Sequence, residues 1–227
     1  FKKRNYLLVS KQFWWLTGIG ILLLAFNSGF PYMTVILRQL EIDIKLFLWV
    51  YAIGNNSIGF LLIALPLLVI HFVALPKTKL FGLTQRFDTR PYFTLLLIIL
   101  PIIVIVSFEN SFQNYYPTYK SNWATALQWP AWVPMIIYEF VYGLDFFNTE
   151  FLFRGFMVIG LAHILGKDTI IPMVVTYCFL HFGKPAGEAI SSIAGGYVLG
   201  VIAFYTRSIW GGVMIHAGLA WMMELAA

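Results

Sequence analysis

The chain has 227 residues, of which 60% are hydrophobic and only 11% are charged, and its formal net charge is +5. This composition excludes an ordinary water-soluble domain and predicts an all-α, polytopic helical membrane protein. The small positive surplus suits anionic lipid headgroups, so we expect membrane lipids as partners and no nucleic acid.

Apolar stretches in the sequence predict about seven transmembrane helices, within a range of six to eight. The first stretch is interrupted by Asn27, Ser28, Gly29 and Pro31. The fourth is too long for one upright helix, which predicts a tilted or broken helix that enters a polar cavity. The predicted spans cover residues 13–36, 46–75, 92–108, 131–166, 169–182, 186–205 and 208–225.

Charges between the spans predict the orientation of the chain. The loop after the second span is basic and should face the cytoplasm, whereas the aromatic loop 109–130 suits the opposite interface. With a cytoplasmic amino terminus, the turns that carry Lys167 and Arg207 fall on the same side as the basic loop. We therefore expect an integral protein of the bacterial inner (plasma) membrane with its amino terminus in the cytoplasm.

Three ionisable residues lie inside predicted spans, namely Glu150, His181 and His216. Such a side chain costs several kcal/mol at this depth unless it is paired, hydrated or used, so each marks a candidate functional site. At about 1.5 Å per helical residue from the cytoplasmic turns, the three lie about 24, 18 and 12 Å deep. They can therefore meet near the middle of the membrane.

Each of these residues also has a purely structural interpretation. Glu150 and Arg154 are four residues apart on one helical face and can form an ion pair that only neutralises itself. His181 precedes a helix-breaking Gly-Lys-Pro sequence, and His216 has small neighbours that permit an interhelical hydrogen bond. The functional interpretation depends on the three residues acting together.

The order and spacing of these residues resemble the CPBP group of intramembrane proteases, also known as CAAX-processing and bacteriocin-processing enzymes or the Abi family. That family has a double glutamate followed four residues later by arginine, then Phe-x-x-x-His, then His-x-x-x-Asn or Asp, each on its own helix. The resemblance covers about residues 131–225. The positions that correspond to the motif, whether or not the residue is the same, are Thr149, Glu150, Arg154, Tyr177, His181, His216 and Ala220.

The resemblance implies an intramembrane endopeptidase that hydrolyses a membrane-embedded or lipidated peptide. It divides the chain into scaffold helices at residues 1–130 and a protease core at residues 131–227. The family mechanism implies that His181, with Glu150 or Glu188, activates water while His216 polarises the scissile carbonyl and Arg154 orients Glu150.

Two departures from the family pattern bear on activity. Thr149 stands where the family has its leading glutamate, which resembles the general base for water, and Ala220 replaces the Asn or Asp that assists the second histidine. Glu188 follows His181 by seven residues and could supply the missing carboxylate by folding back. The alternative is that Glu188 pairs with Lys184.

Three further hypotheses stay open at this point. Two histidines and a carboxylate are a common zinc set, although the sequence has no His-Glu-x-x-His signature, so no cofactor is certain and zinc is an alternative. The chain could instead be a catalytically inactive relative that serves as a subunit or chaperone of a membrane complex, with other membrane proteins as partners. A transporter is the third hypothesis, but no inverted repeat is visible in the sequence.

Overall fold

The computed structural model describes residues 10–84, 86 and 88–227, and within them the chain forms helices and turns without a β-strand. The all-α prediction is confirmed. The main helices are α2 (Lys11–Gly29), α3 (Tyr32–Leu37), α4 (Ile44–Ala74), α5 (Arg90–Val106), α6 (Asn110–Tyr115), α7 (Trp132–Glu150), the π-helical η4 (Phe151–Gly160), α8 (Ala162–Leu165), α9 (Ile170–Phe179), α10 (Ala186–Thr206) and α11 (Trp210–Ala226).

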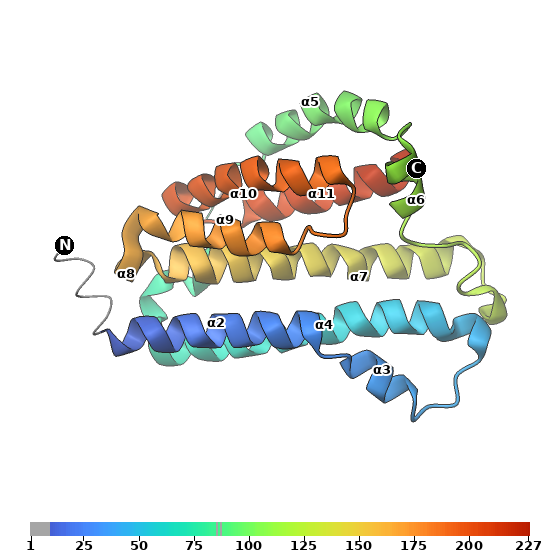
Figure 1. The fold of residues 1–227 in the computed structure, drawn as a ribbon, viewed down its shortest axis with the longest axis horizontal. Helices are drawn as coiled ribbons and strands as arrows, with labels where there is room; N and C mark the ends of the chain where they lie inside the picture. The colour runs from blue at the N-terminus through green and yellow to red at the C-terminus, as the bar shows by residue number, and fades with distance from the viewer. Residues whose placement is uncertain (1–9, 85, 87) are drawn as a thin grey trace.

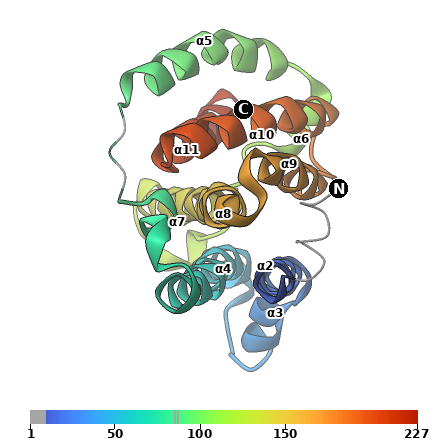
Figure 2. The ribbon, with the colours of Figure 1, turned by 90° about the vertical axis from the view of Figure 1, so that its left-hand side faces the viewer.

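The long helices run side by side along the longest axis of the molecule (Figure 1). Seen end on, α2, α3 and α4 form one layer, α7 lies next to it, α9, α10 and α11 form the next layer, and α5 lies outermost (Figure 2). The helix α4 packs along α7, and α11 contacts both α7 and α5. This arrangement places α7 between the amino-terminal helices and the carboxyl-terminal ones.

Three stretches of the described chain are long and apolar enough to cross a membrane, namely Ile44–Ala74, Trp132–Phe179 and Ala186–Thr206, and Arg90–Val106 is a shorter apolar helix. The predicted count of seven spans remains a prediction. The first predicted span is divided as expected, because α2 ends at Gly29 and α3 begins after Pro31. The fourth reverses at Gly166, whose φ of 62° ends α8 before α9 begins.

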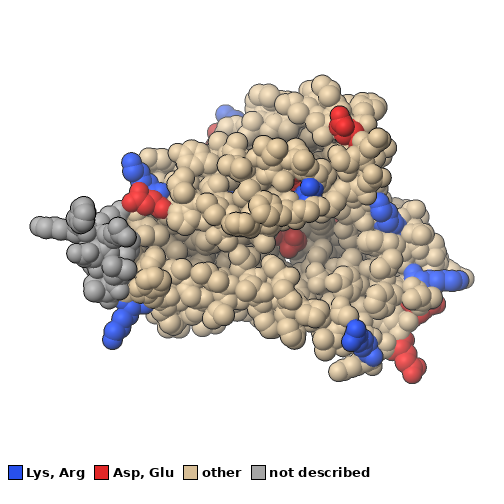
Figure 3. Space-filling model, in the orientation of Figure 1, with Lys and Arg blue, Asp and Glu red and all other residues tan. Residues whose placement is uncertain are grey.

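The outer surface fits a lipid environment. Large apolar side chains on several helices are exposed, including Leu22 on α2, Phe72 and Val73 on α4 and Ile105 on α5. Charged side chains gather mainly toward the two ends of the long axis (Figure 3). The basic residues Lys77, Lys79 and Arg207 line one recess together with Gln12, so these segments share one end of the molecule, as the expected topology requires.

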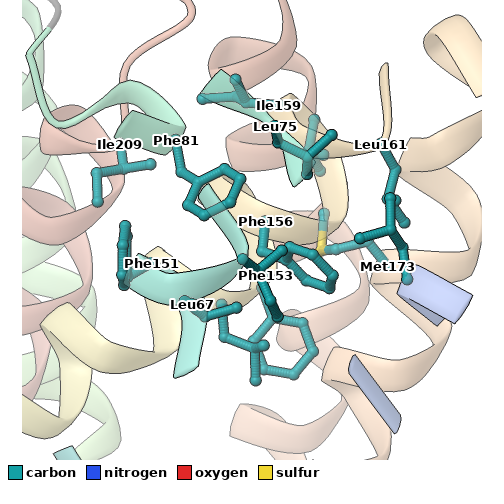
Figure 4. Close-up of a cluster of buried hydrophobic side chains, with 14 of the residues drawn as sticks. Leu67, Leu75, Phe81, Phe151, Phe153, Phe156, Ile159, Leu161, Met173 and Ile209 are labelled. Carbon is teal, nitrogen blue, oxygen red and sulfur yellow. The ribbon is translucent and has the colours of Figure 1, made fainter. Parts of the chain in front are cut away.

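The largest buried cluster surrounds η4 and fixes it in the bundle (Figure 4). Phe81 comes from the loop after α4 and inserts fully buried against Phe151 and Phe156, with ring centroids 5.7 and 5.8 Å away. Gly155 permits this approach, because a Cβ there would lie 3.0 Å from the Phe81 carbonyl oxygen. The loop thus locks the helical segment that carries Arg154.

Candidate active site

The centre of the candidate site is Glu150, the last residue of α7, whose side chain is fully buried. Its Oε1 accepts a hydrogen bond from Arg154 Nη1 at 2.8 Å and another from His216 Nδ1 at 3.2 Å. A carboxylate only accepts, so Nδ1 of His216 carries the proton in this pair. Two residues from different helices are therefore held by one carboxylate oxygen.

Arg154 lies one turn further on, where the α-helix continues as the π-helical η4. The wider winding is visible at Leu161, whose backbone N–H donates to the carbonyl of Phe156, five residues earlier, at 3.2 Å. The predicted pair of Glu150 with Arg154 is present in this geometry. Within proteins, π-helical turns frequently occur at functional sites, which agrees with this placement.

Tyr177 on α9 joins the buried pair to both histidines. The guanidinium of Arg154 lies 4.3 Å from the centroid of the Tyr177 ring, which stabilises the cation, and the Tyr177 hydroxyl is 3.3 Å from His216 Nε2. The rings of Tyr177 and His181 lie 4.5 Å apart. The hydroxyl that distinguishes this Tyr from the family's Phe thus contacts the site.

His181 follows the end of α9 and is buried. Its Nδ1 lies 3.1 Å from the backbone carbonyl of Tyr177, and a carbonyl only accepts, so Nδ1 carries the proton. Its Nε2 is then left as an acceptor when the ring is neutral. This tautomer suits a group that accepts a proton from water.

A cavity of about 230 Å³ lies beside these residues. It includes His181 and His216 in its wall together with Asp145 and Thr149 of α7, and α2 and α4 contribute apolar and polar wall residues. Figure 3 shows a hollow near the middle of this face, between α2 and α9, with acidic atoms inside it and basic atoms above it. The cavity therefore brings both predicted histidines to one space within the helical bundle.

Residues 127–222 match the model of one protein family, described as type II CAAX prenyl endopeptidase Rce1-like. The matched region covers less than half of the chain and is similar to the Rce1-like family. No curated protein and no solved structure matches the chain. The Rce1-like match confirms the resemblance to CPBP intramembrane proteases, and together with the apolar helices it indicates an integral membrane protein.

The Rce1-like region departs from the family motif at Thr149 and Ala220, and the structure shows the surroundings of both residues. Thr149, at the position of the leading glutamate, lies on the cavity wall. Ala220, at the position of the Asn or Asp, is buried in an apolar cluster with Phe146 and Ala217. Neither side chain can act as a general base, so any base must come from elsewhere on the wall.

Glu188 does not fold back to His181. Its Oε1 accepts from Lys184 Nζ at 2.6 Å, and its Oε2 accepts from the Tyr116 hydroxyl at 2.9 Å. Burial and the Glu188 charge raise the pKa of Tyr116 well above its usual range, so this phenol stays a donor. Both oxygens of Glu188 are thus engaged, and Oε1 forms the ion pair with Lys184 that was the alternative interpretation of the sequence.

The structure offers no support for zinc. Among residues 10–84, 86 and 88–227, no three His, Cys, Asp or Glu side chains are grouped so that they could hold a metal ion. Glu150 and His216 are together, but the third ligand is missing because Glu188 is held by Lys184. We therefore derive no step through a metal.

Proposed function

We propose that this chain is an intramembrane endopeptidase that cleaves a membrane-embedded or lipidated peptide with an activated water molecule. The observation that supports it best is the cavity that His181 and His216 share within an Rce1-like helical core. At a share of about 30 Å³ per water, this volume holds several water molecules or a short stretch of peptide backbone. Water inside the membrane is what hydrolysis at this depth requires.

The two histidines fit different roles in this reaction. Glu150 orients His216 through Nδ1, and a proton on Nε2 of His216 would stabilise the negative oxygen that develops on the scissile carbonyl. His181 has its Nε2 free to accept a hydrogen bond from the attacking water and so to help activate it. Arg154 orients Glu150 and takes no direct part, and the mechanism forms no covalent intermediate.

The amino-terminal helices fit the substrate part of the proposal. Leu24 on α2 and Ile63 on α4 place apolar atoms on the cavity wall opposite α7, and Asn27 and Ser28 place polar atoms beside them. Such a wall suits an apolar peptide segment or a lipid tail together with the polar backbone of the bond to be cleaved. We infer that residues 1–130 act as the scaffold that encloses the substrate and residues 131–227 as the protease core.

A prenylated peptide ending in Cys-a-a-X and a single-span membrane peptide, each presented to the purified protein in lipid vesicles, test this proposal. We expect cleavage of at least one probe by the wild-type protein. His181→Ala and His216→Ala should each lower the cleavage rate by about 10²-fold or more, because each removes a proton acceptor or an oxyanion donor. Product analysis by mass spectrometry measures the rate.

The second candidate is a catalytically inactive subunit or chaperone of a membrane complex, and the absence of a carboxylate at Thr149 and of an amide at Ala220 favours it. It predicts that neither probe is cleaved. It also predicts that His181→Ala and His216→Ala change the stability of a membrane complex without changing any proteolytic product.

A smaller effect is expected from Tyr177→Phe. The variant keeps the ring beside Arg154 and His181 but loses the hydroxyl that lies 3.3 Å from His216 Nε2. One hydrogen bond contributes about 0.5–1.5 kcal/mol, so the cleavage rate should fall by no more than about tenfold. A fall as large as that of His216→Ala would show that the hydroxyl itself takes part in the reaction.

A further inference from the structure

The Rce1-like core carries a carboxylate on its cavity wall that the family motif does not assign. Asp145 lies on α7 four residues before Thr149, so both residues occupy the same helical face, about 6 Å apart along the axis. Both line the cavity that His181 and His216 share. The family's missing carboxylate position thus has an acidic residue one helical turn away.

Asp145 can accept a proton from water in the cavity, whereas the carboxylates of Glu150 and Glu188 are already engaged by other side chains. Glu150 is fully buried behind the wall and bonded to Arg154 and His216, and Glu188 is bonded through both oxygens. Among the described residues that line the cavity, Asp145 is the only carboxylate. Within that part of the chain, no hydrogen bond or ion pair engages it.

Two side chains that can carry a positive charge lie around Asp145 in the cavity. The side chains of His216 and Lys184 both act electrostatically on it, and Lys184 also lines the cavity. His181, with its acceptor Nε2, lines the same cavity. A water molecule in this cavity would therefore have two proton acceptors, Asp145 and His181, and the donor His216 around it.

We propose that Asp145 is the carboxylate that activates water in this protein, taking over the role that Thr149 cannot fill. This inference rests on the proposed function. Asp145 accepts a proton from the water, and the water oxygen forms a bond to the scissile carbonyl carbon while His216 stabilises the oxyanion. The carbon–nitrogen bond then breaks, and the proton held by Asp145 passes to the leaving nitrogen. The products are a new carboxyl terminus and a new amine, and no other reactant is needed.

Asp145→Asn in the full-length protein tests this assignment, with the prenylated Cys-a-a-X peptide or the single-span peptide as probe. The amide keeps the shape of the side chain but cannot take a proton. We expect kcat to fall by about 10²-fold or more with KM and the unfolding temperature unchanged. Glu139→Gln is the matched control, because it makes the same chemical change on the same helix outside the cavity and should leave kcat unchanged.

A rescue variant separates a lost base from a disturbed fold. Asp145→Asn with Thr149→Glu places a carboxylate at the family position on the same wall, so kcat should recover in large part. The inference is overturned if Asp145→Asn cleaves at the wild-type rate, or if it is slow only because it unfolds and the second substitution does not restore activity. A wild-type protein that cleaves neither probe overturns the proposed function as well, which distinguishes the two failures.

Discussion

Replacing Arg154 with Met is expected to lower the free energy of unfolding by about 3–5 kcal/mol. Both members of the Glu150–Arg154 pair are fully buried, and their atoms lie 2.8 Å apart. Met keeps the apolar stem but removes the positive charge, so the Glu150 carboxylate would remain buried with only His216 to balance it. Unfolding of the purified protein in mixed micelles measures the change.

Two controls identify the cause of that loss. Lys184→Met breaks the pair with Glu188, whose side chains retain 22% and 17% exposure, and should cost no more than about 1 kcal/mol. Glu150→Gln with Arg154→Met leaves no buried charge unpaired and should recover much of the lost stability. If Arg154→Met has the same free energy of unfolding as the wild-type protein, Arg154 is not needed to balance the buried charge of Glu150.

Gly212→Ala is expected to lower the cleavage rate by about 10²-fold, because it displaces the carboxylate that holds His216. A Cβ on Gly212 of α11 would overlap Glu150 Oε2, far inside van der Waals contact. Glu150 cannot move away freely, since its other oxygen bonds both Arg154 and His216. The unfolding temperature should fall as well, because the added methyl group overpacks the interface between α7 and α11.

Gly195→Ala is the matched control for this substitution. Gly195 lies within α10, and a Cβ there would meet no atom within 4 Å. Alanine also has the higher helix propensity, so stability should be unchanged or slightly raised, and cleavage should be unchanged. Equal activity of Gly212→Ala and Gly195→Ala would contradict the role of the Glu150 carboxylate in holding His216.

Local sequence signals predicted much of this architecture. The hydropathy of the apolar stretches located the main helices, and the cluster from Asn27 to Pro31 located the break between α2 and α3. The spacing of Glu150 and Arg154 predicted their ion pair, since residues four apart on a helix lie on one face. The prediction that His216 can meet this pair from another helix is also met by its contact with Glu150.

The contact of Glu188 with Tyr116 and the position of Asp145 were not predicted, for different reasons. The bond between Glu188 and Tyr116 depends on where a loop 72 residues away is placed, and no local pattern gives that information. Asp145 carried a local signal, because it stands one turn before Thr149 on the same face. Its position in the sequence does not identify it as a cavity residue, since only the packing of α2, α4 and α9 around α7 shows which face of α7 borders the cavity.

The most direct test of the account is cleavage by the purified wild-type protein in vesicles prepared in ¹⁸O-labelled water, with the prenylated Cys-a-a-X peptide and the single-span peptide as probes. Direct attack by water predicts a cleaved peptide whose new carboxyl terminus carries one ¹⁸O atom in a single turnover, and Asp145→Asn should form this product about 10²-fold more slowly. If the wild-type protein cleaves neither probe, or if Asp145→Asn forms the labelled product at the wild-type rate, the cavity is not the hydrolytic site that this account describes.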